Sequence, residues 1–289
     1  MSDKISLGEL IAVLPEVHGQ HARTTRLYAL LEKISAETVK NSPFARSENA
    51  REILGDFGAI ELPYYAMGAV DSLDLFGLDE LMIFAFYWKN RSRYRRSADI
   101  GANLGLHSVL MEKCGWHVKA YEPDPRHAAI LRQNLTRNGS IGVELVEAAV
   151  SDKAGRLEFV RVLGNTTSSH LVGAKQNAYG ELERFPVAVE AIGDIMPEVD
   201  FVKMDAEGQE KTIILGTTAQ HWAAVDMMVE VGSEPNAEAI YGHLRRLGLN
   251  AYAQRLGWGR VASLAEMPTS YRHGSLFLTA RPFGPWNQG

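Results

Sequence analysis

The sequence predicts an α/β fold in which a doubly wound, mostly parallel sheet has helices on both of its faces. Short apolar segments of strand character alternate with helical segments between residues 97 and 280, and this alternation is typical of βαβ units. A turn with two glycines, at residues 101–105, separates the first of these strands from the helix that follows it, as in the opening unit of such sheets. The chain has 289 residues, 46% of them hydrophobic, which is enough for one large domain with an appendage.

The predicted sheet has seven strands, each a short run of mainly apolar residues. They are expected at residues 97–99, 118–121, 143–148, 199–204, 227–230, 249–253 and 275–280. Apolar residues at helical spacing predict helices between most of them, at residues 106–114, 126–138, 210–215 and 237–247. Between the third and fourth strands, the insertion at residues 151–197 contains two alternating segments, 155–162 and 185–191, which predict an additional pair of strands.

The first 90 residues are predicted to form a mainly helical extension of the domain at residues 91–289. An apolar stripe at helical spacing runs from Leu7 to Leu14, and Pro15 ends it. Residues 50–54 are expected to form a short helix, and a strongly apolar helix is expected to end near residue 90.

The composition argues against several kinds of partner. The net charge is −5, and no basic excess points to nucleic acid. The most apolar run, residues 81–88, is far too short to span a bilayer. Cys114 is the one cysteine, so no disulfide can form within the chain, and the N-terminus contains no long apolar run of the signal-peptide type. We therefore expect a cytoplasmic protein without nucleic-acid or membrane partners.

The glycine turn and the strand after it predict a site for an adenosine-type ligand. Gly101 and Gly105 allow a tight turn with Asn103 between them, and the next helix begins with free backbone N–H groups. Glu122 ends the second strand, 23 residues after Asp99, where a carboxylate can accept hydrogen bonds from two ribose hydroxyls. The spacing G-x-G-x-x-G is absent, which counts against an NAD-dependent oxidoreductase.

Together with a third motif, these segments resemble one enzyme family. They read Asp-Ile-Gly-Ala-Asn-Leu-Gly from Asp99, Tyr-Glu-Pro-Asp-Pro from Tyr121 and Lys-Met-Asp-Ala-Glu-Gly-Gln-Glu from Lys203. In this order they resemble the FkbM family of class I S-adenosylmethionine-dependent methyltransferases, over roughly residues 98–280. The resemblance implies a Rossmann-like sheet of strand order 3-2-1-4-5-7-6 with its last strand antiparallel. It also implies S-adenosyl-L-methionine as the cofactor and O-methylation of a hydroxyl on a sugar or another secondary metabolite.

Polar groups at the C-terminal ends of the strands are the candidates for holding this cofactor. The expected cofactor-binding residues are Asp99, Gly101, Asn103, Gly105, Glu122, Ser151, Asp152 and Asp205. The first four are expected to shape the methionine half of the site, Glu122 to bind the ribose, and Asp152 to lie beside the adenine. Stabilisation of the turn is the alternative role for Asp99, and capping of a loop is the alternative for Asp152.

Methyl transfer to a hydroxyl requires a group that takes the hydroxyl proton as the methyl is attacked. Asp205 and Glu207, directly after the fourth strand, are the expected bases, and His170 or His107 is the alternative. Glu210 is expected near the start of a helix, with stabilisation of that helix and catalysis as its two open roles.

Two further expectations concern metals and partners. Asp205, Glu207 and Glu230 offer oxygen ligands, but no H-x-E or D-x-D spacing accompanies them, so we expect no metal. The acceptor is expected to be a small hydroxylated molecule, and the N-terminal extension a cap over it or a contact in a homodimer. N-methylation of an amide or amine, and a non-catalytic nucleotide-binding module, are the alternative functions.

Overall fold

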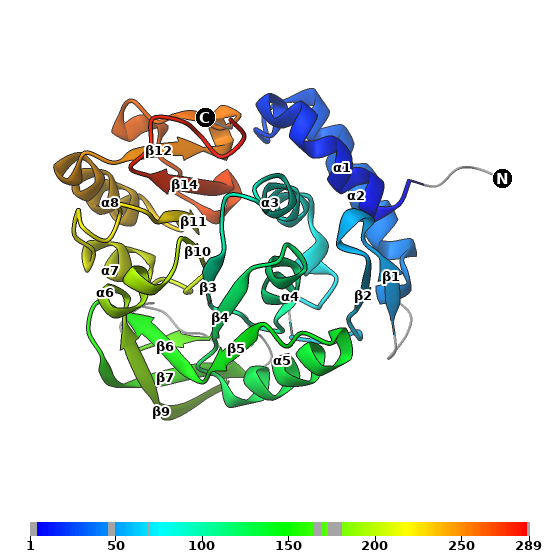
Figure 1. Ribbon diagram of the computed structural model, residues 1–289, viewed down its shortest axis with the longest axis horizontal. Helices are drawn as coiled ribbons and strands as arrows, with labels where there is room; N and C mark the ends of the chain where they lie inside the picture. Colours follow the sequence, from blue (N-terminus) through cyan, green and yellow to red (C-terminus); the bar gives the residue numbers. More distant parts are fainter. Residues whose placement is uncertain (1–4, 46–49, 69, 164–168, 173–180, 288–289) are drawn as a thin grey trace.

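The computed structural model describes residues 5–45, 50–68, 70–163, 169–172 and 181–287. At its centre lies a sheet of eight strands in the order β13-β12-β14-β11-β10-β3-β4-β5 (Figure 1). These strands are β3 (Arg96–Ile100), β4 (His117–Tyr121), β5 (Val143–Val146), β10 (Phe201–Met204), β11 (Asp226–Glu230), β12 (Asn250–Ala253), β13 (Gly259–Arg260) and β14 (Ser275–Thr279).

The strand order confirms the predicted fold class and the order that the family resemblance implies. Strands β5, β4, β3, β10 and β11 run parallel to one another. Strand β14 lies antiparallel between β11 and β12. The eighth strand, β13, is an addition to the seven expected strands. It has two residues, which is too short for a recognisable alternation of side chains.

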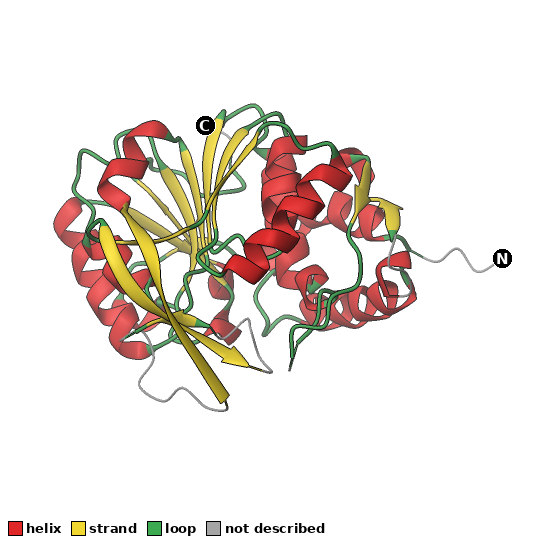
Figure 2. Cartoon of the chain, turned by 90° about the horizontal axis from the view of Figure 1, so that it is seen from below, coloured by secondary structure: helices red, strands yellow, loops and turns green. Residues whose placement is uncertain are grey.

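Helices cover both faces of this sheet (Figure 2). They are α3 (Leu78–Lys89), α4 (Leu106–Lys113), α5 (Pro125–Asn138), α6 (Ile192–Ile195), α7 (Glu210–Leu215) and α8 (Glu234–Leu247). Because side chains alternate along a strand, Phe201 packs in the hydrophobic cluster with α3, α4 and α5. Its neighbour Val202 packs in the cluster with α6, α7 and α8. The two clusters explain why these strands are apolar on both faces.

The N-terminal segment contains α1 (Leu7–Val13), α2 (Arg26–Asn41) and a hairpin of β1 (Arg51–Ile53) with β2 (Ala59–Glu61). The expected short helix at residues 50–54 is therefore wrong. Gly55 and Gly58 both have positive φ, +56° and +75°, and together they turn the chain back into the antiparallel pair.

Helix α3 is buried along most of its length, as its apolar sequence predicts. Phe86 is fully buried, with its ring centroid 5.4 Å from that of Phe201 on β10 and 5.7 Å from that of Phe277 on β14. The helix thus shares one hydrophobic cluster with the sheet and with the N-terminal helices. The domain boundary at residue 90 stays a prediction.

The insertion forms a second sheet in the order β6-β9-β7-β8. Its strands are β6 (Ala148–Ser151), β7 (Gly155–Leu163), β8 (His170–Leu171) and β9 (Glu181–Ala191). The antiparallel pair of β7 and β9 confirms the predicted strand pair. The predicted third strand at residues 143–148 is too long, because the chain leaves the main sheet after Val146, and Ala148 begins a strand parallel to β9.

An aromatic cluster joins the N-terminal segment to the C-terminal one. The Trp258 indole N–H donates to His21 Nδ1 at 2.9 Å, and His21 Nε2 lies 3.0 Å from the Leu14 carbonyl oxygen. Trp286 packs edge-on against His21 and stacks on His18. Burial lowers the pKa of His21 to about 4, despite the opposing effect of the Leu14 carbonyl, so the ring is neutral near pH 7.

Candidate active site

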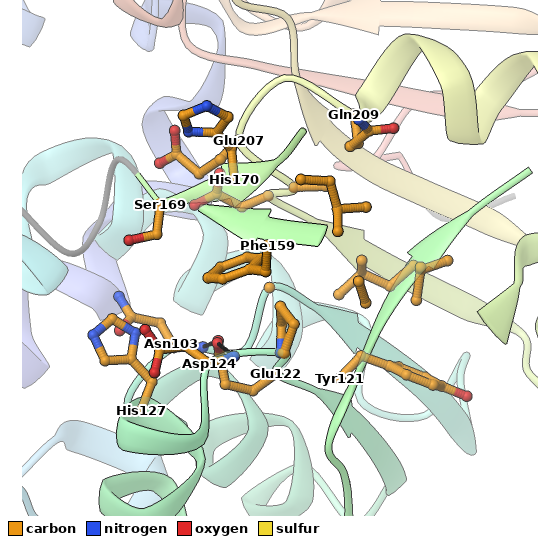
Figure 3. Close-up of a pocket in the computed structure, with 18 of the residues that line it drawn as sticks. Asn103, Tyr121, Glu122, Asp124, His127, Phe159, Ser169, His170, Glu207 and Gln209 are labelled. Atoms are coloured by element: carbon orange, nitrogen blue, oxygen red, sulfur yellow. Dashed lines mark hydrogen bonds between the residues drawn. The ribbon is translucent and has the colours of Figure 1, made fainter. Parts of the chain in front are cut away.

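A cavity of about 260 Å³ opens at the C-terminal ends of the parallel strands. Strands β3, β4 and β10 lead into it, and the insertion closes it with Phe159 and His170. Figure 3 shows Asn103, Glu122, Asp124 and His127 in the lower part of this cavity and Glu207 and His170 in the upper part. The position agrees with the rule that ligands of such sheets bind beyond the carboxyl ends of the strands.

Gly101 and Gly105 are required by close backbone contacts at this corner. Both have positive φ, +77° and +85°. A Cβ atom on Gly101 would lie 1.8 Å from the Asp205 carbonyl oxygen, and one on Gly105 would lie 2.8 Å from Leu131 Cγ. The first glycine therefore lets the loop after β3 touch the loop after β10, and the second lets α4 begin against α5.

Glu122 holds the glycine loop and faces the cavity. One carboxyl oxygen accepts the Asn103 N–H at 2.8 Å, and the other accepts the Asp124 N–H at 2.9 Å. The residue is 5% exposed, and this burial raises its pKa to about 8 against the opposing effect of the two N–H groups. The buried Oδ1 of Asn103 has no hydrogen-bond partner among the described residues.

Asp99 does not line the cavity. Its Oδ2 accepts the Ser108 hydroxyl of α4 at 2.6 Å, and its Oδ1 lies 3.7 Å from Lys203 Nζ. The side chain is fully buried. These contacts match the alternative role, in which Asp99 orders the turn from within the fold.

Ser151 and Asp152 also lie outside the cavity lining. The Ser151 hydroxyl donates to Asp152 Oδ1 at 3.2 Å, and Asp152 is exposed beside Gly216. Strand β6 instead lines the cavity with Ala149 and Val150. Asp152 is therefore not among the residues that line the cavity, and its expected place beside the adenine stays a prediction.

The loop after β10 brings Asp205 and Glu207 to the cavity wall. Glu207 has a φ of +49°, which a non-glycine residue adopts only where surrounding contacts impose it. Glu210, 1% exposed, imposes this turn, because its carboxylate accepts the Ala206 N–H at 3.1 Å and the Gly208 N–H at 3.0 Å. Of its two open roles, the structure places Glu210 in support of the loop and the helix start.

The two histidine candidates differ in position. His170 of β8 is buried and lines the cavity. His107 does not line it, and both of its ring nitrogens are engaged. Its Nδ1 lies 2.8 Å from the Tyr87 hydroxyl and its Nε2 3.0 Å from Glu80 Oε2, so His107 is a structural residue here.

Some residues that line the cavity were not predicted from the sequence. Glu80 on α3 reaches the cavity from the N-terminal segment, and His127 reaches it from α5. Burial of Glu80 opposes its ionisation, but His107 and Lys203 outweigh this effect and lower its pKa. No local motif marks Glu80, because its position depends on the packing of α3.

A buried ion pair joins the insertion to the segment between β4 and α5. Arg161 of β7 donates from Nε to Asp124 Oδ2 at 2.7 Å, and a second nitrogen reaches Oδ1. Asp124 also caps α5 by accepting the Arg126 N–H at 2.8 Å. The two charged side chains are 3% and 1% exposed. The sequence Asp124-Pro125 is a helix-start signal that could have located the cap but not its partner.

The described part of the chain contains no group of three His, Cys, Asp or Glu residues placed to hold a metal ion. No described helix combines the length and apolar character needed to cross a membrane.

Comparison with known proteins agrees with this geometry. Residues 99–254 match the methyltransferase FkbM domain. Methyltransferase sdnD of Sordaria araneosa is 27% identical over 201 residues, which cover 55% of this chain and 75% of that protein.

Solved structures show similarity at low identity. The human methyltransferase 10 domain containing protein superposes with a TM-score of 0.41 and 13% identity, over 88% of this chain and 98% of that one. The O-methyltransferase of Bacillus cereus in complex with SAH superposes with a TM-score of 0.35 and 11% identity, over 68% of this chain and 78% of that one. Neither similarity bears on function.

The strand order, with antiparallel β14 between β11 and β12, is the one expected of a class I methyltransferase sheet. The chain belongs to the FkbM methyltransferase family, and its cofactor is S-adenosyl-L-methionine. The residues present fit this cofactor. Gly101 leaves no room for a side chain, the buried Oδ1 of Asn103 has no hydrogen-bond partner among the described residues, and the Glu122 carboxyl group lies at the cavity wall.

Proposed function

We propose that this enzyme O-methylates a hydroxyl group of a sugar or another small secondary metabolite in the cytoplasm. One observation supports the proposal most. The cofactor corner, with Asn103 and Glu122, and the proton-accepting side chains Asp205, Glu207 and His170 line the same cavity. A hydroxyl acceptor needs such a base, whereas a neutral amine needs it less.

When bound, S-adenosylmethionine supplies a methyl group that its sulfonium activates for displacement. The chain then has to align the acceptor and remove its proton. Gly101 and Asn103 are proposed to hold the methionine half of the cofactor, and Glu122 the ribose. The carboxylate of Asp205 or Glu207, or the His170 ring, is proposed to take the hydroxyl proton as attack proceeds, since an alcohol does not ionise near pH 7.

The phenyl ring of Phe159 and the side chain of Leu171, both from the insertion, cover the cavity with apolar surface. This cover is proposed to keep water from the methyl group, because bulk water would compete with the acceptor hydroxyl. The role of the N-terminal helices, as a cap over the acceptor or as a contact in a homodimer, stays a prediction. The absence of nucleic-acid and membrane partners also stays a prediction.

Carbon-13 NMR of the product tests the proposal. The enzyme is incubated with S-adenosylmethionine labelled in its methyl group and with matched panels of hydroxylated and amine acceptors. A methyl signal in the O-methyl region supports the proposal, whereas an N-methyl signal contradicts it. Binding of S-adenosylhomocysteine without turnover of any acceptor would instead identify a non-catalytic binding module.

Three conservative variants then identify the base. Asp205→Asn, Glu207→Gln and His170→Gln are compared with Glu238→Gln, which alters an exposed residue of α8 outside the cavity. Loss of the base lowers kcat by about 100-fold to 10,000-fold with the acceptor KM little changed. Full turnover in all three variants refutes the assignment.

A further inference from the structure

A second cavity lies beside the cofactor cavity, between the N-terminal segment and the C-terminal ends of the strands. Its volume is about 560 Å³, against about 260 Å³ for the cofactor cavity. Tyr28 and Glu32 of α2 line one side, and Glu230 at the end of β11 lines the other. Asp74 and Glu80 line both cavities, so the two meet near the start of α3.

The junction contains a buried hydroxyl group. Ser275 is 1% exposed, and its Oγ has no hydrogen-bond partner among the described residues. It is the register partner of Glu230 across the β11–β14 pair. Together with Glu80, Lys203 and Asp205 it lines a gap of about 10 Å³, roughly the space of one water molecule. Asp205 also lines the cofactor cavity, so this gap lies between the two larger spaces. Its polar lining residues offer hydrogen bonds to an occupant, beside apolar ones such as Ile83 and Met228.

The second cavity carries an excess of carboxyl groups. Among its described lining residues, the acidic ones are Glu32, Asp71, Asp74, Asp79, Glu80 and Glu230, and the basic ones are Arg23 and Lys40. Arg23 is already paired with Asp79, which also accepts the Tyr28 hydroxyl at 3.0 Å. Asp71 and Asp74 accept backbone N–H groups of nearby residues, and Glu80 pairs with His107. The described lining nevertheless carries more carboxyl groups than cations.

The environment of Glu230 shows the consequence of this excess. Burial and then the carboxylates of Asp205, Glu80 and Asp79 raise its pKa well above the usual range, and Lys203 opposes them only in part. The Tyr271 ring also lies at this wall, with its hydroxyl near Gly232. A carboxyl group whose ionisation is disfavoured in this way, as that of Glu230 is, is stabilised by a cation placed beside it.

Building on the proposed O-methylation, we propose that the second cavity binds the acceptor, and that the acceptor is a polyhydroxylated molecule carrying a protonated amine. The amine lies between Glu80 and Glu230, and the hydroxyl groups bond to the other carboxylates and to Ser275. The hydroxyl to be methylated then points past Asp205 into the cofactor cavity. An anionic acceptor, such as a sugar phosphate, is repelled by the same wall.

Binding of three matched probes to the enzyme saturated with S-adenosylhomocysteine tests this inference. The probes are methyl glucosaminide, methyl glucoside and methyl glucoside phosphate, which present the same ring with positive, zero and negative charge. Calorimetry at millimolar probe concentrations is expected to show that affinity falls in that order. The affinity for the cation is expected to be at least about tenfold higher than that for the neutral sugar. Binding of the cation is also expected to release protons as Glu230 ionises.

Glu230→Gln is expected to remove most of the preference for the cation while S-adenosylhomocysteine affinity is retained, because Glu230 does not line the cofactor cavity. Glu238→Gln, the exposed control, is expected to keep the preference. Equal binding of the three probes, tighter binding of the phosphate, or no binding of any probe overturns the inference, whether or not the variants fold. These results leave the proposed O-methylation standing, since that depends on the chemistry of the product.

Discussion

Lowering the pH below 8 is expected to weaken binding of S-adenosylhomocysteine, because Glu122 has to ionise to accept two ribose hydroxyls. In the ligand-free protein, burial raises the pKa of this carboxyl to about 8. Both of its oxygens already accept backbone N–H groups, from Asn103 and Asp124. A protonated carboxyl has a hydrogen of its own to place and one acceptor oxygen fewer, so ligand binding favours the ionised form.

The magnitude follows from the fraction of Glu122 that is ionised. Each pH unit below the pKa reduces this fraction about tenfold, so at about pH 6 the affinity is expected to be about 100-fold below its plateau above a pKa of about 8. Binding near pH 7 is expected to release close to one proton. The raised pKa of Glu122 also affects folding. It stabilises the folded protein fully below about pH 4.5, and this contribution is lost as the pH rises towards 8.

Isothermal titration calorimetry at several pH values, in two buffers of different ionisation enthalpy, measures both effects. Glu122→Gln is expected to bind more weakly and without this pH dependence. Glu144→Gln, an exposed residue on neighbouring β5, is expected to keep it. An affinity that stays flat between pH 6 and 8, with no proton release, would show that Glu122 is ionised before the ligand arrives and would refute the reasoning.

Two further substitutions test the contacts that shape the site. Gly101→Ala places a Cβ atom 1.8 Å from the Asp205 carbonyl oxygen at a φ of +77°, and is expected to lower the free energy of unfolding by about 3 kcal/mol or more and to abolish micromolar S-adenosylhomocysteine binding. Arg161→Met leaves the buried carboxylate of Asp124 without its cation and is expected to lower the free energy of unfolding by about 3 kcal/mol. Urea denaturation measures both values.

Each substitution has a matched control. Gly139→Ala also imposes a positive φ, +62°, but its Cβ meets no atom within 4 Å, so it isolates backbone strain from the clash and is expected to cost about 1 kcal/mol. The double variant Asp124→Asn with Arg161→Met removes both charges and is expected to recover part of the loss. A Gly101→Ala loss no larger than that of Gly139→Ala, or an Arg161→Met loss below about 1 kcal/mol, contradicts the corresponding argument.

The apolar pattern predicted the strands of the main sheet other than β13, and helix α7, whose bounds Glu210–Leu215 agree with the expected residues 210–215. The order of the strands was implied by the family resemblance and not by the pattern. Side chains on both faces of a buried parallel strand are apolar, so such strands appear as continuous runs. The end of β5 was not evident from the sequence, because one residue, Glu147, separates Val146 from Ala148, although these two pair in different sheets.

The residues of the turn after β3 were predictable, because strand and turn geometry alone place Gly101 and Asn103. The direction of a side chain beyond a strand end was not. Asp152 follows β6 by one residue and does not line the cavity, whereas Ala149 and Val150 of β6 do. Glu80 was not predictable, since its position depends on how α3 packs against the sheet.

The aromatic cluster of His18, His21, Trp258 and Trp286 gives the protein an intrinsic optical reporter. Both indoles are 6% exposed and lie where the N-terminal segment meets the C-terminal one. If the N-terminal helices separate from the domain, water reaches these two rings and their emission shifts to longer wavelength. Trp116 and Trp222, each 1% exposed in the core, keep their emission until the sheet unfolds. Fluorescence of the unlabelled chain therefore distinguishes movement of the helices around the second cavity from global unfolding.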